Sequence, residues 1–343
     1  MKLEKGINFG GWLSQCNHTK KRYDSFISKE DVEQVARFGL DHIRVPFDYN
    51  LITDENGNLI ESGFSYLDKI ISWCKDENLN VILDLHKAPG YDFNNAIVSE
   101  NNTLFRNELL QEKFISIWNE VSRRYACKSN VAFELLNEVV ENEFAEAWNL
   151  LIKKTVNAIR KNAPNTPIIY GGIQWNSAST LKFLDPPVDE NVYFTFHFYE
   201  PLIFTHQKAK WVTHMNMENI VTYPNSMEYY TELSIPLGYK GKDTTDSKEK
   251  ENVKVFLLEK INEAITAAKK QNVKLYCGEF GVIDQAPDKD SLNWFKDVFS
   301  IFHENNIGSA IWTYKEMDFG ITGNHYRNIL SDLIHFYISK EEI

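Results

Sequence analysis

The sequence has no long apolar run and no excess of positive charge, which excludes two classes of protein. No stretch of about 18 or more apolar residues occurs, so nothing predicts a transmembrane helix. The formal net charge is -11, whereas a nucleic acid or an anionic membrane surface requires a basic patch. We therefore expect neither nucleic acid nor membrane as a partner.

Cysteine is scarce as well. The four cysteines, Cys16, Cys74, Cys127 and Cys277, show no C-x-x-C spacing. We predict four free thiols, three of them buried, in a fold that does not depend on disulfides. The nine histidines include no His-Glu-x-x-His motif, and no P-loop, nucleophile elbow or dinucleotide fingerprint occurs. We therefore expect neither a metal nor a cofactor, and we expect a monomer.

The first six residues, Met-Lys-Leu-Glu-Lys-Gly, carry basic residues but no apolar segment typical of a signal peptide. Two interpretations stay open: a cytoplasmic protein, or a secreted one whose leader lies outside this sequence. Aromatic residues make up 13% of the chain, more than a core usually needs. Most belong to the core, and the surplus would suit a cleft that stacks flat sugar faces.

Strand-like and helix-like segments alternate along the whole chain. Eight short apolar runs predict strands, at residues 6–9, 42–47, 80–86, 131–137, 167–172, 192–199, 274–281 and 308–314. Amphipathic stretches between them predict helices after the capping box at residues 28–31 and at 66–77, 107–125, 143–161, 250–271, 288–305 and 326–338. Between the fifth and sixth strands, only a short helical turn is expected at 177–184. This α/β pattern predicts one (β/α)₈ TIM barrel over residues 1–343.

One segment, residues 200–250, interrupts this alternation. Most connections from a strand to the next helix are only about 2–6 residues long, and long ones at this face are usually functional. The segment contains Trp211, Tyr223, Tyr229 and Tyr230. We predict a small inserted subdomain that covers the active-site face, with a disordered loop as the alternative.

Two glutamates close strand-like runs: Glu138 ends the run that begins at Val131, and Glu279 lies near the end of the run that begins at Lys274. Taken alone, either glutamate could equally well be a surface residue at the end of a strand or a catalytic residue. In a TIM barrel, however, polar residues at the C-terminal strand ends are normally catalytic. A carboxylic acid and a carboxylate about 5–5.5 Å apart hydrolyse glycosidic bonds with retention. Together, these two residues predict a retaining glycosidase.

Further polar and aromatic residues lie at the same predicted strand ends: Arg44, His86, Asn137, His197, Tyr199 and Trp312. Glu134 lies an even number of residues before Glu138, so in an extended strand its side chain would point to the same side. We predict that Glu134 is an acid inside the barrel, paired with Arg44 or a histidine. A third catalytic carboxylate is the alternative. Cys277 is interpreted as part of the barrel filling rather than as a nucleophile.

Seven motifs, taken in chain order, give the sequence a specific resemblance. Together they resemble glycoside hydrolase family 5 over essentially the whole chain: Gly6-Ile-Asn-Phe-Gly-Gly-Trp12, Asp41-His-Ile-Arg-Val-Pro-Phe47, Leu83-Asp-Leu-His86, Leu136-Asn-Glu138, His197-Phe-Tyr199, Gly278-Glu-Phe-Gly281 and Ile311-Trp312. The sequence departs from the usual motifs at Val139, where the family has proline, and at Lys87, where some relatives have a second histidine. The chemistry is expected to be unaffected, and any difference from these relatives is expected in recognition of the glycone.

The resemblance implies a role for each matching residue. Glu138 would be the acid/base and Glu279 the nucleophile, which Arg44 and Tyr199 would hold ionised. Asn137 would bind the sugar 2-hydroxyl. The central subsite would be lined by His86 and His197, with Trp312 as its floor. From the inserted segment, we add Trp211 as a wall of the substrate groove.

The resemblance implies an endo-β-1,4-glucanase with a β-glucan polysaccharide or oligosaccharide as substrate. A β-mannanase or glucomannanase and an exo-β-1,3-glucanase are alternatives within the family. A barrel that binds carbohydrate without catalysis is the alternative from another class, and the two intact glutamates argue against it.

Overall fold

The computed structural model describes residues 1–95 and 102–339. Eight parallel strands form a closed barrel in which each strand pairs with its neighbours in the sequence and β1 pairs with β8. The strands are β1 (Lys5–Asn8), β2 (His42–Asp48), β3 (Asn80–Lys87), β4 (Val131–Glu134), β5 (Ile168–Gly171), β6 (Val192–Phe198), β7 (Lys274–Phe280) and β8 (Gly308–Ile311). All eight predicted strands are confirmed, and most end earlier than the apolar runs do.

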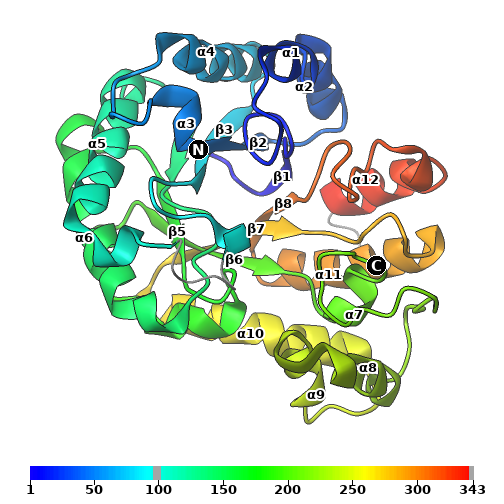
Figure 1. Cartoon of the computed structure of the whole chain (residues 1–343). Coiled ribbons are helices and arrows are strands. Elements are labelled where there is room, and N and C mark those ends of the chain that lie inside the picture. The colour runs from blue at the N-terminus through cyan, green and yellow to red at the C-terminus, as the bar shows by residue number, and fades with distance from the viewer. Residues whose placement is uncertain (96–101, 340–343) are drawn as a thin grey trace.

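Helices surround the barrel (Figure 1). The α-helices are α1 (Lys20–Ser25), α2 (Lys29–Arg37), α3 (Tyr49–Ile52), α4 (Glu61–Asp76), α5 (Glu108–Tyr125), α6 (Ala145–Asn162), α7 (Leu202–Thr205), α8 (Met227–Ser234), α9 (Lys242–Thr245), α10 (Val253–Gln271), α11 (Asp288–Glu304) and α12 (Leu330–Ile338). The short 3₁₀ helices include η1 (Phe93–Asn95), η3 (Leu104–Arg106), η4 (Asn142–Phe144), η5 (Ala178–Phe183), η6 (Ile235–Gly241) and η7 (Asn324–Tyr326). The predicted capping box is present at Ser28 and Asp31, and η5 is the predicted helical turn.

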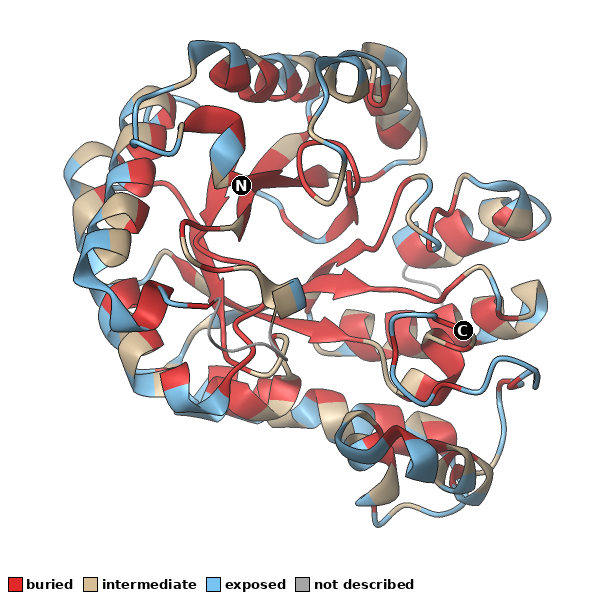
Figure 2. Ribbon diagram, viewed as in Figure 1, coloured by how far each residue is buried: buried red, intermediate tan, exposed pale blue. Residues whose placement is uncertain are grey.

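Side chains of each strand alternate between two environments. In β3, Val81, Leu83 and Leu85 belong to the large core between strands and helices. Ile82 instead joins Ala132 and other residues in a small separate cluster, which the alternation places inside the barrel. The strands and the inner faces of the helices are buried, whereas the outer faces of the helices are more exposed (Figure 2).

Three register shifts occur near the C-terminal ends of the strands, at Phe47/Asp48, Phe196/His197 and Cys277/Phe280. In the pair of β6 and β7, Phe196 lies opposite Cys277, but His197 lies opposite Glu279, so Gly278 is the extra residue. Bulges of this kind bend a strand and re-aim its side chains. A Cβ at Gly278 would lie 3.1 Å from His197 Nε2, so this close approach favours glycine.

The long connection after β6 is folded. It contains α7, α8, η6 and α9, and α8 and α9 lie beside α10 at the edge of the barrel (Figure 1). Tyr223, Tyr230 and Met227 are buried in the core. The alternative of a disordered loop is therefore wrong, while the role of the segment as a subdomain over the active site stays a prediction.

All four cysteines are free, as predicted. Cys74 and Cys277 are buried, whereas Cys127 is exposed and Cys16 is half-buried, so the prediction of three buried thiols is wrong. Cys127 comes just after α5, in the turn that leads to β4, and this explains its exposure. Within the described residues, none of the helices is long and apolar enough to cross a membrane.

Candidate active site

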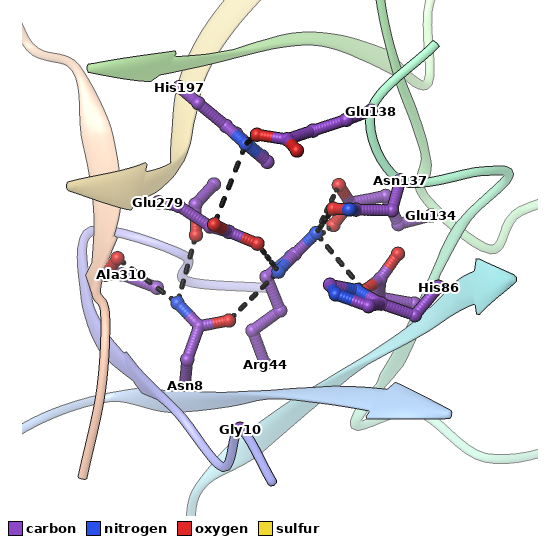
Figure 3. A network of polar contacts seen from close by, with 12 residues as sticks. Asn8, Gly10, Arg44, His86, Glu134, Asn137, Glu138, His197, Glu279 and Ala310 are labelled. Atoms are coloured by element: carbon purple, nitrogen blue, oxygen red, sulfur yellow. Dashed lines mark hydrogen bonds and ion pairs between the residues drawn. The ribbon is translucent and has the colours of Figure 1, made fainter. Parts of the chain in front are cut away.

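Arg44, in the middle of β2, occupies the centre of the site and is fully buried. Its Nε and Nη2 donate to the two carboxylate oxygens of Glu134, at 2.7 and 2.9 Å. Nη1 donates to Asn8 Oδ1 at 2.9 Å and to Glu279 Oε1 at 2.8 Å, and Nη2 also donates to Asn137 Oδ1 at 2.9 Å (Figure 3). The predicted pairing of Glu134 with Arg44 is confirmed.

A buried guanidinium requires negative partners, because an isolated charge in the interior is very costly. Three carboxylates surround Arg44: Glu134, Glu279 and Asp84, whose Oδ2 lies 3.1 Å from Nη2. Asn8 fixes the arrangement from the other side, since its Nδ2 donates to the carbonyl groups of Gly278 and Ala310. The network therefore joins β1, β2, β3, β4, β7 and β8.

Glu138 and Glu279 come together with His197 at the mouth of the barrel. One carboxylate oxygen from each glutamate and one ring nitrogen of the histidine all lie within 4.8 Å of one another. His197 Nδ1 is 2.8 Å from Glu138 Oε1 and 3.6 Å from Glu279 Oε2. His197 thus lies between the two carboxylates, whereas the sequence predicted only that it lines the central subsite.

The surroundings of the two carboxylates differ. Burial, followed by the nearby charge of Glu279, raises the pKa of Glu138 well above its ordinary value. Burial also raises the pKa of Glu279, but Arg44 opposes this effect, and so does the hydrogen bond from Tyr199 Oη to Glu279 Oε2 at 3.0 Å. The predicted partners of Glu279, Arg44 and Tyr199, are in place. They favour the charged carboxylate, but the effect of burial is larger, so the net shift of the Glu279 pKa is upward.

Burial favours the neutral form of both histidines of the site. Burial lowers the pKa of His86 to about 4 and that of His197 well below its ordinary value. His86 Nδ1 lies 2.6 Å from Asp84 Oδ2, and its Nε2 lies 2.8 Å from Gln15 Nε2. Because only one ring nitrogen of a neutral imidazole carries a proton, Nδ1 donates to Asp84 and Nε2 accepts from Gln15.

Two side chains are positioned to receive a ligand. Asn137 Oδ1 is used by Arg44, whereas its buried Nδ2 has no hydrogen-bond partner among the described residues. Such donors are rarely left unsatisfied. The Trp312 ring stacks against His86 with an angle of 3° and 5.9 Å between centroids. A Cβ at Gly10 would lie 2.8 Å from the Trp312 ring, so a larger residue there would displace the indole.

The loop after β5, which contacts residues of the site, has a strained backbone conformation. Gln174, Trp175 and Asn176 all have positive φ, at 53°, 57° and 54°. Left-handed conformations cost L-residues about 1–2 kcal/mol each. The amides of Gln174 and Trp175 donate to Val140 and Val139, immediately after Glu138.

Asn176 Nδ2 lies 3.4 Å from His197 Nε2. The strained turn therefore connects the backbone beside one glutamate to the histidine between both glutamates. Strain of this kind persists where the surrounding contacts determine the conformation, and it is frequent at functional sites.

Trp211 lies further from the centre than the other predicted residues, and its side chain is 52% exposed. Its ring contacts His206 at 6.4 Å between centroids, and His206 contacts Tyr199 at 4.9 Å. Trp211 is therefore connected to Glu279 through two aromatic contacts and the hydrogen bond from Tyr199, at the rim of the site. Its contact with a substrate stays a prediction.

Several residues in and around this network were not predicted from the sequence: Asn8, Gln15, Asp84, Trp175, Asn176 and Lys240. Asn8 and Asp84 lie inside two of the motifs used for the family resemblance, and a polar residue in a buried strand was the available signal. Lys240 comes from η6, and its Nζ lies 5.5 Å from the Trp175 ring. No periodicity predicts that contact, because the two residues belong to separate irregular segments.

Comparison with known proteins agrees with this geometry. The family model described as cellulase (glycosyl hydrolase family 5) matches residues 4–318. The chain is 38% identical over 344 residues to endoglucanase C of Acetivibrio thermocellus, with 99% of both chains covered. It is 37% identical over 304 residues to cellodextrinase A of Ruminococcus flavefaciens, with 88% of this chain and 83% of that protein covered. Among solved structures, the clostridial cellulose synthase subunit Z of Clostridioides difficile superposes with a TM-score of 0.77 at 26% identity, covering 98% of this chain and 100% of that one.

The Arg44 network yields a stability prediction. Arg44→Met leaves Glu134 and Asp84 buried without their cation, and breaking a buried pair in this way costs about 3–5 kcal/mol. We expect a correspondingly lower free energy of unfolding, measured by urea denaturation at neutral pH. Arg123→Met, which breaks an ion pair with Glu120 on the surface, is the control and should change stability little. Equal effects of the two substitutions would contradict the central role of Arg44.

Proposed function

Since this chain belongs to glycosyl hydrolase family 5 and is a glycoside hydrolase, we propose that it is a retaining endo-β-1,4-glucanase. Its substrates in this proposal are cellulose-type and mixed-linkage β-glucans and their oligosaccharides. The names of the two relatives, an endoglucanase and a cellodextrinase, support this substrate class. One chain supplies every residue of the proposed site, which supports action as a monomer.

The observation that carries the proposal is the closeness of Glu138 and Glu279, whose carboxylate oxygens lie within 4.8 Å. Retaining glycosidases have carboxyl groups about 5–5.5 Å apart, whereas inverting enzymes need about 6.5–9.5 Å to accommodate a water molecule. The distance therefore supports double displacement through a covalent glycosyl-enzyme.

In the first step, the Glu279 carboxylate attacks the anomeric carbon while the glycosidic C–O bond breaks. Glu138 donates its proton to the leaving oxygen, so the aglycone departs as an alcohol. Arg44 and Tyr199 each hold one oxygen of Glu279, which fixes the direction of attack. Asn137 Nδ2, the donor left without a partner among the described residues, would bind the 2-hydroxyl of the reacting sugar.

In the second step, the ionised Glu138 removes a proton from water, and the water oxygen bonds to the anomeric carbon as the bond to Glu279 breaks. Both carboxyl groups then return to their starting states, and one water molecule has been consumed. His197 Nδ1–H donates to Glu138 Oε1 in this scheme. The other carboxylate oxygen of Glu138, Oε2, therefore remains free to carry the proton that Glu138 donates in the first step and accepts in the second.

The leaving-group side of the site is formed by the β5 loop and the inserted segment. Glu138 defines this side, because a general acid must touch the departing oxygen. Trp175 and Lys240 lie next to it, and Lys240 is close enough to Glu138 for their charges to interact. We assign the aglycone to this side and the glycone to the opposite side, toward β2 and β3.

The two glutamates are distinguished by their response to leaving-group acidity. Glu279→Ala should lower kcat by many orders of magnitude on every substrate, because no covalent intermediate can form. Glu138→Ala should retain formation of the glycosyl-enzyme on 2,4-dinitrophenyl cellobioside, whose leaving group needs little protonation, and lose it on cellotetraose. Stopped-flow and steady-state kinetics on both substrates measure this. Identical profiles for the two variants would show that the roles are assigned wrongly.

The pH profile of kcat/KM should be bell-shaped. The rate rises with pH as Glu279 ionises and falls as Glu138 loses its proton. Because burial raises both pKa values, both limbs should lie above pH 4.5, the ordinary pKa of a glutamic acid, although the apparent values belong to the pair.

Glu138→Gln, assayed for glycosylation with the dinitrophenyl substrate, should keep the acid limb and lose the basic one. The wild-type enzyme on the same substrate is the control for the assay. A basic limb that persists in the variant would assign that proton to another group.

For Trp211, we predict contact with the outer part of the substrate. Trp211→Ala should raise KM for cellopentaose by about 2- to 10-fold, the effect of losing an aromatic stacking contact, with little change for cellobiosides. Phe183→Ala is a matched control, because the Phe183 side chain is also 52% exposed but lies in η5 on the outer layer. Equal kinetics of the two variants on long and short substrates would remove Trp211 from the site.

A further inference from the structure

Glu138 lies beyond the end of its strand, whereas Glu279 lies within one. β4 ends at Glu134, and the last contact that ties the following backbone to the sheet is the amide of Asn137, which donates to the carbonyl of Leu85 in β3 at 3.0 Å. Glu279 belongs to β7, so the pairing with β6 fixes its backbone. The backbone that carries Glu138 therefore depends on support from loops.

Two loops support this backbone from opposite sides. In the loop after β5, the amides of Gln174 and Trp175 donate to the carbonyls of Val140 and Val139, both at 3.1 Å. From the loop after β3, Tyr91 Oη accepts a hydrogen bond from the amide of Val140 at 2.8 Å. The N–H of Val140 is thus bound to one loop and its C=O to the other.

The Tyr91 hydroxyl belongs to a chain of buried side chains. Its proton faces two acceptors, the backbone carbonyl of Glu138 and Oε2 of Glu141, each at 3.2 Å. Glu141 Oε1 accepts from Asn102 Nδ2 at 2.8 Å, and Asn102 Oδ1 accepts from the amide of Asp92 at 3.1 Å. Tyr91, Asn102 and Glu141 are all buried, and buried polar groups are costly to leave unpaired, so each one orients the next. We call these three side chains the Tyr91 brace.

We propose that Tyr91, held by Glu141 and Asn102, is a positioning residue for the acid/base Glu138. The brace contacts Glu138 and Val140 through their backbone atoms, so it determines where the Glu138 carboxyl group lies. A general acid has to lie within hydrogen-bonding distance of the leaving oxygen, and a displacement of about 1 Å can lower the rate about 100-fold. This inference rests on the proposed function, because it takes from it the role of Glu138.

Two cellobiosides that differ only in their leaving group test the brace. We would measure kcat/KM, which reports formation of the glycosyl-enzyme, for phenyl and 2,4-dinitrophenyl β-cellobioside. Phenol needs a proton to depart, whereas dinitrophenol needs little help. Tyr91→Phe leaves the amide of Val140 without its acceptor and frees the backbone beside Glu138. The variant should lower kcat/KM about 10- to 100-fold on the phenyl substrate and less than about 3-fold on the dinitrophenyl substrate.

Two substitutions of Glu141 separate hydrogen bonding from charge. Glu141→Gln keeps an acceptor for Asn102 and can donate to Tyr91 Oη, whose own proton then stays on the carbonyl of Glu138. Glu141→Leu removes both contacts. We expect the glutamine variant to keep the wild-type ratio of kcat/KM between the two substrates, and the leucine variant to resemble Tyr91→Phe. An equal change of the ratio in both variants would assign the effect to the charge of Glu141 and overturn the brace.

Tyr125→Phe is the matched control for a loss of stability. Tyr125 is similarly buried, and its Oη donates to Asp68 Oδ1 at 3.0 Å between α5 and α4. This variant loses one buried hydrogen bond away from the site and should keep the wild-type ratio. A folded Tyr91→Phe enzyme with the wild-type ratio overturns the positioning role. If Tyr91→Phe does not fold, the two Glu141 variants decide, and a wild-type ratio in Glu141→Leu overturns it.

Glu138→Ala, measured on the same two substrates, separates failure of the brace from failure of the proposed function. This variant should lose far more activity on the phenyl substrate than on the dinitrophenyl substrate. If it loses both equally, the acid/base role of Glu138 is wrong, and the proposed function fails in that part. If it shows the expected difference while Tyr91→Phe and Glu141→Leu keep the wild-type ratio, only the brace is wrong.

Discussion

The buried guanidinium of Arg44 determines how the barrel mouth is organised. It donates to Glu134, Glu279, Asn8 and Asn137, so all its N–H groups are engaged without solvent. Each partner is held in one orientation because leaving any donor unpaired in the interior is costly. Glu279 is thus fixed by an interaction that also stabilises the fold, so in the proposed reaction its carboxylate would lose little freedom when substrate binds.

Glu138 and Glu279 have chemically identical side chains, but their different neighbours give them different properties. Glu279 contacts a cation and a phenol, which favour its charged form, whereas Glu138 contacts a neutral histidine and faces the charge of Glu279. Glu138 is therefore the group that holds a proton more strongly, as the general acid requires. The bulge at Gly278 and the left-handed turn at Gln174, Trp175 and Asn176 supply the geometry that brings the histidine to both carboxylates.

Much of this arrangement could be predicted from the sequence. Short apolar runs predicted all eight strands. The C-terminal ends of those runs pointed to Arg44, Glu138 and Glu279, because parallel strands in a barrel bring these ends to one face. The bulge at Gly278 and the contact between Lys240 and Trp175 could not be predicted, since they depend on register and on irregular segments from distant parts of the chain.

Trapping the covalent intermediate tests the division of labour between the two glutamates most directly. A 2-deoxy-2-fluoro-β-cellobioside with an activated leaving group slows both steps, and breakdown of the glycosyl-enzyme becomes slow enough for the adduct to accumulate. Peptide mass spectrometry should then find one fluorocellobiosyl group on Glu279, and none in Glu279→Gln. A label on Glu138, or hydrolysis to the inverted anomer without any adduct, would contradict the account.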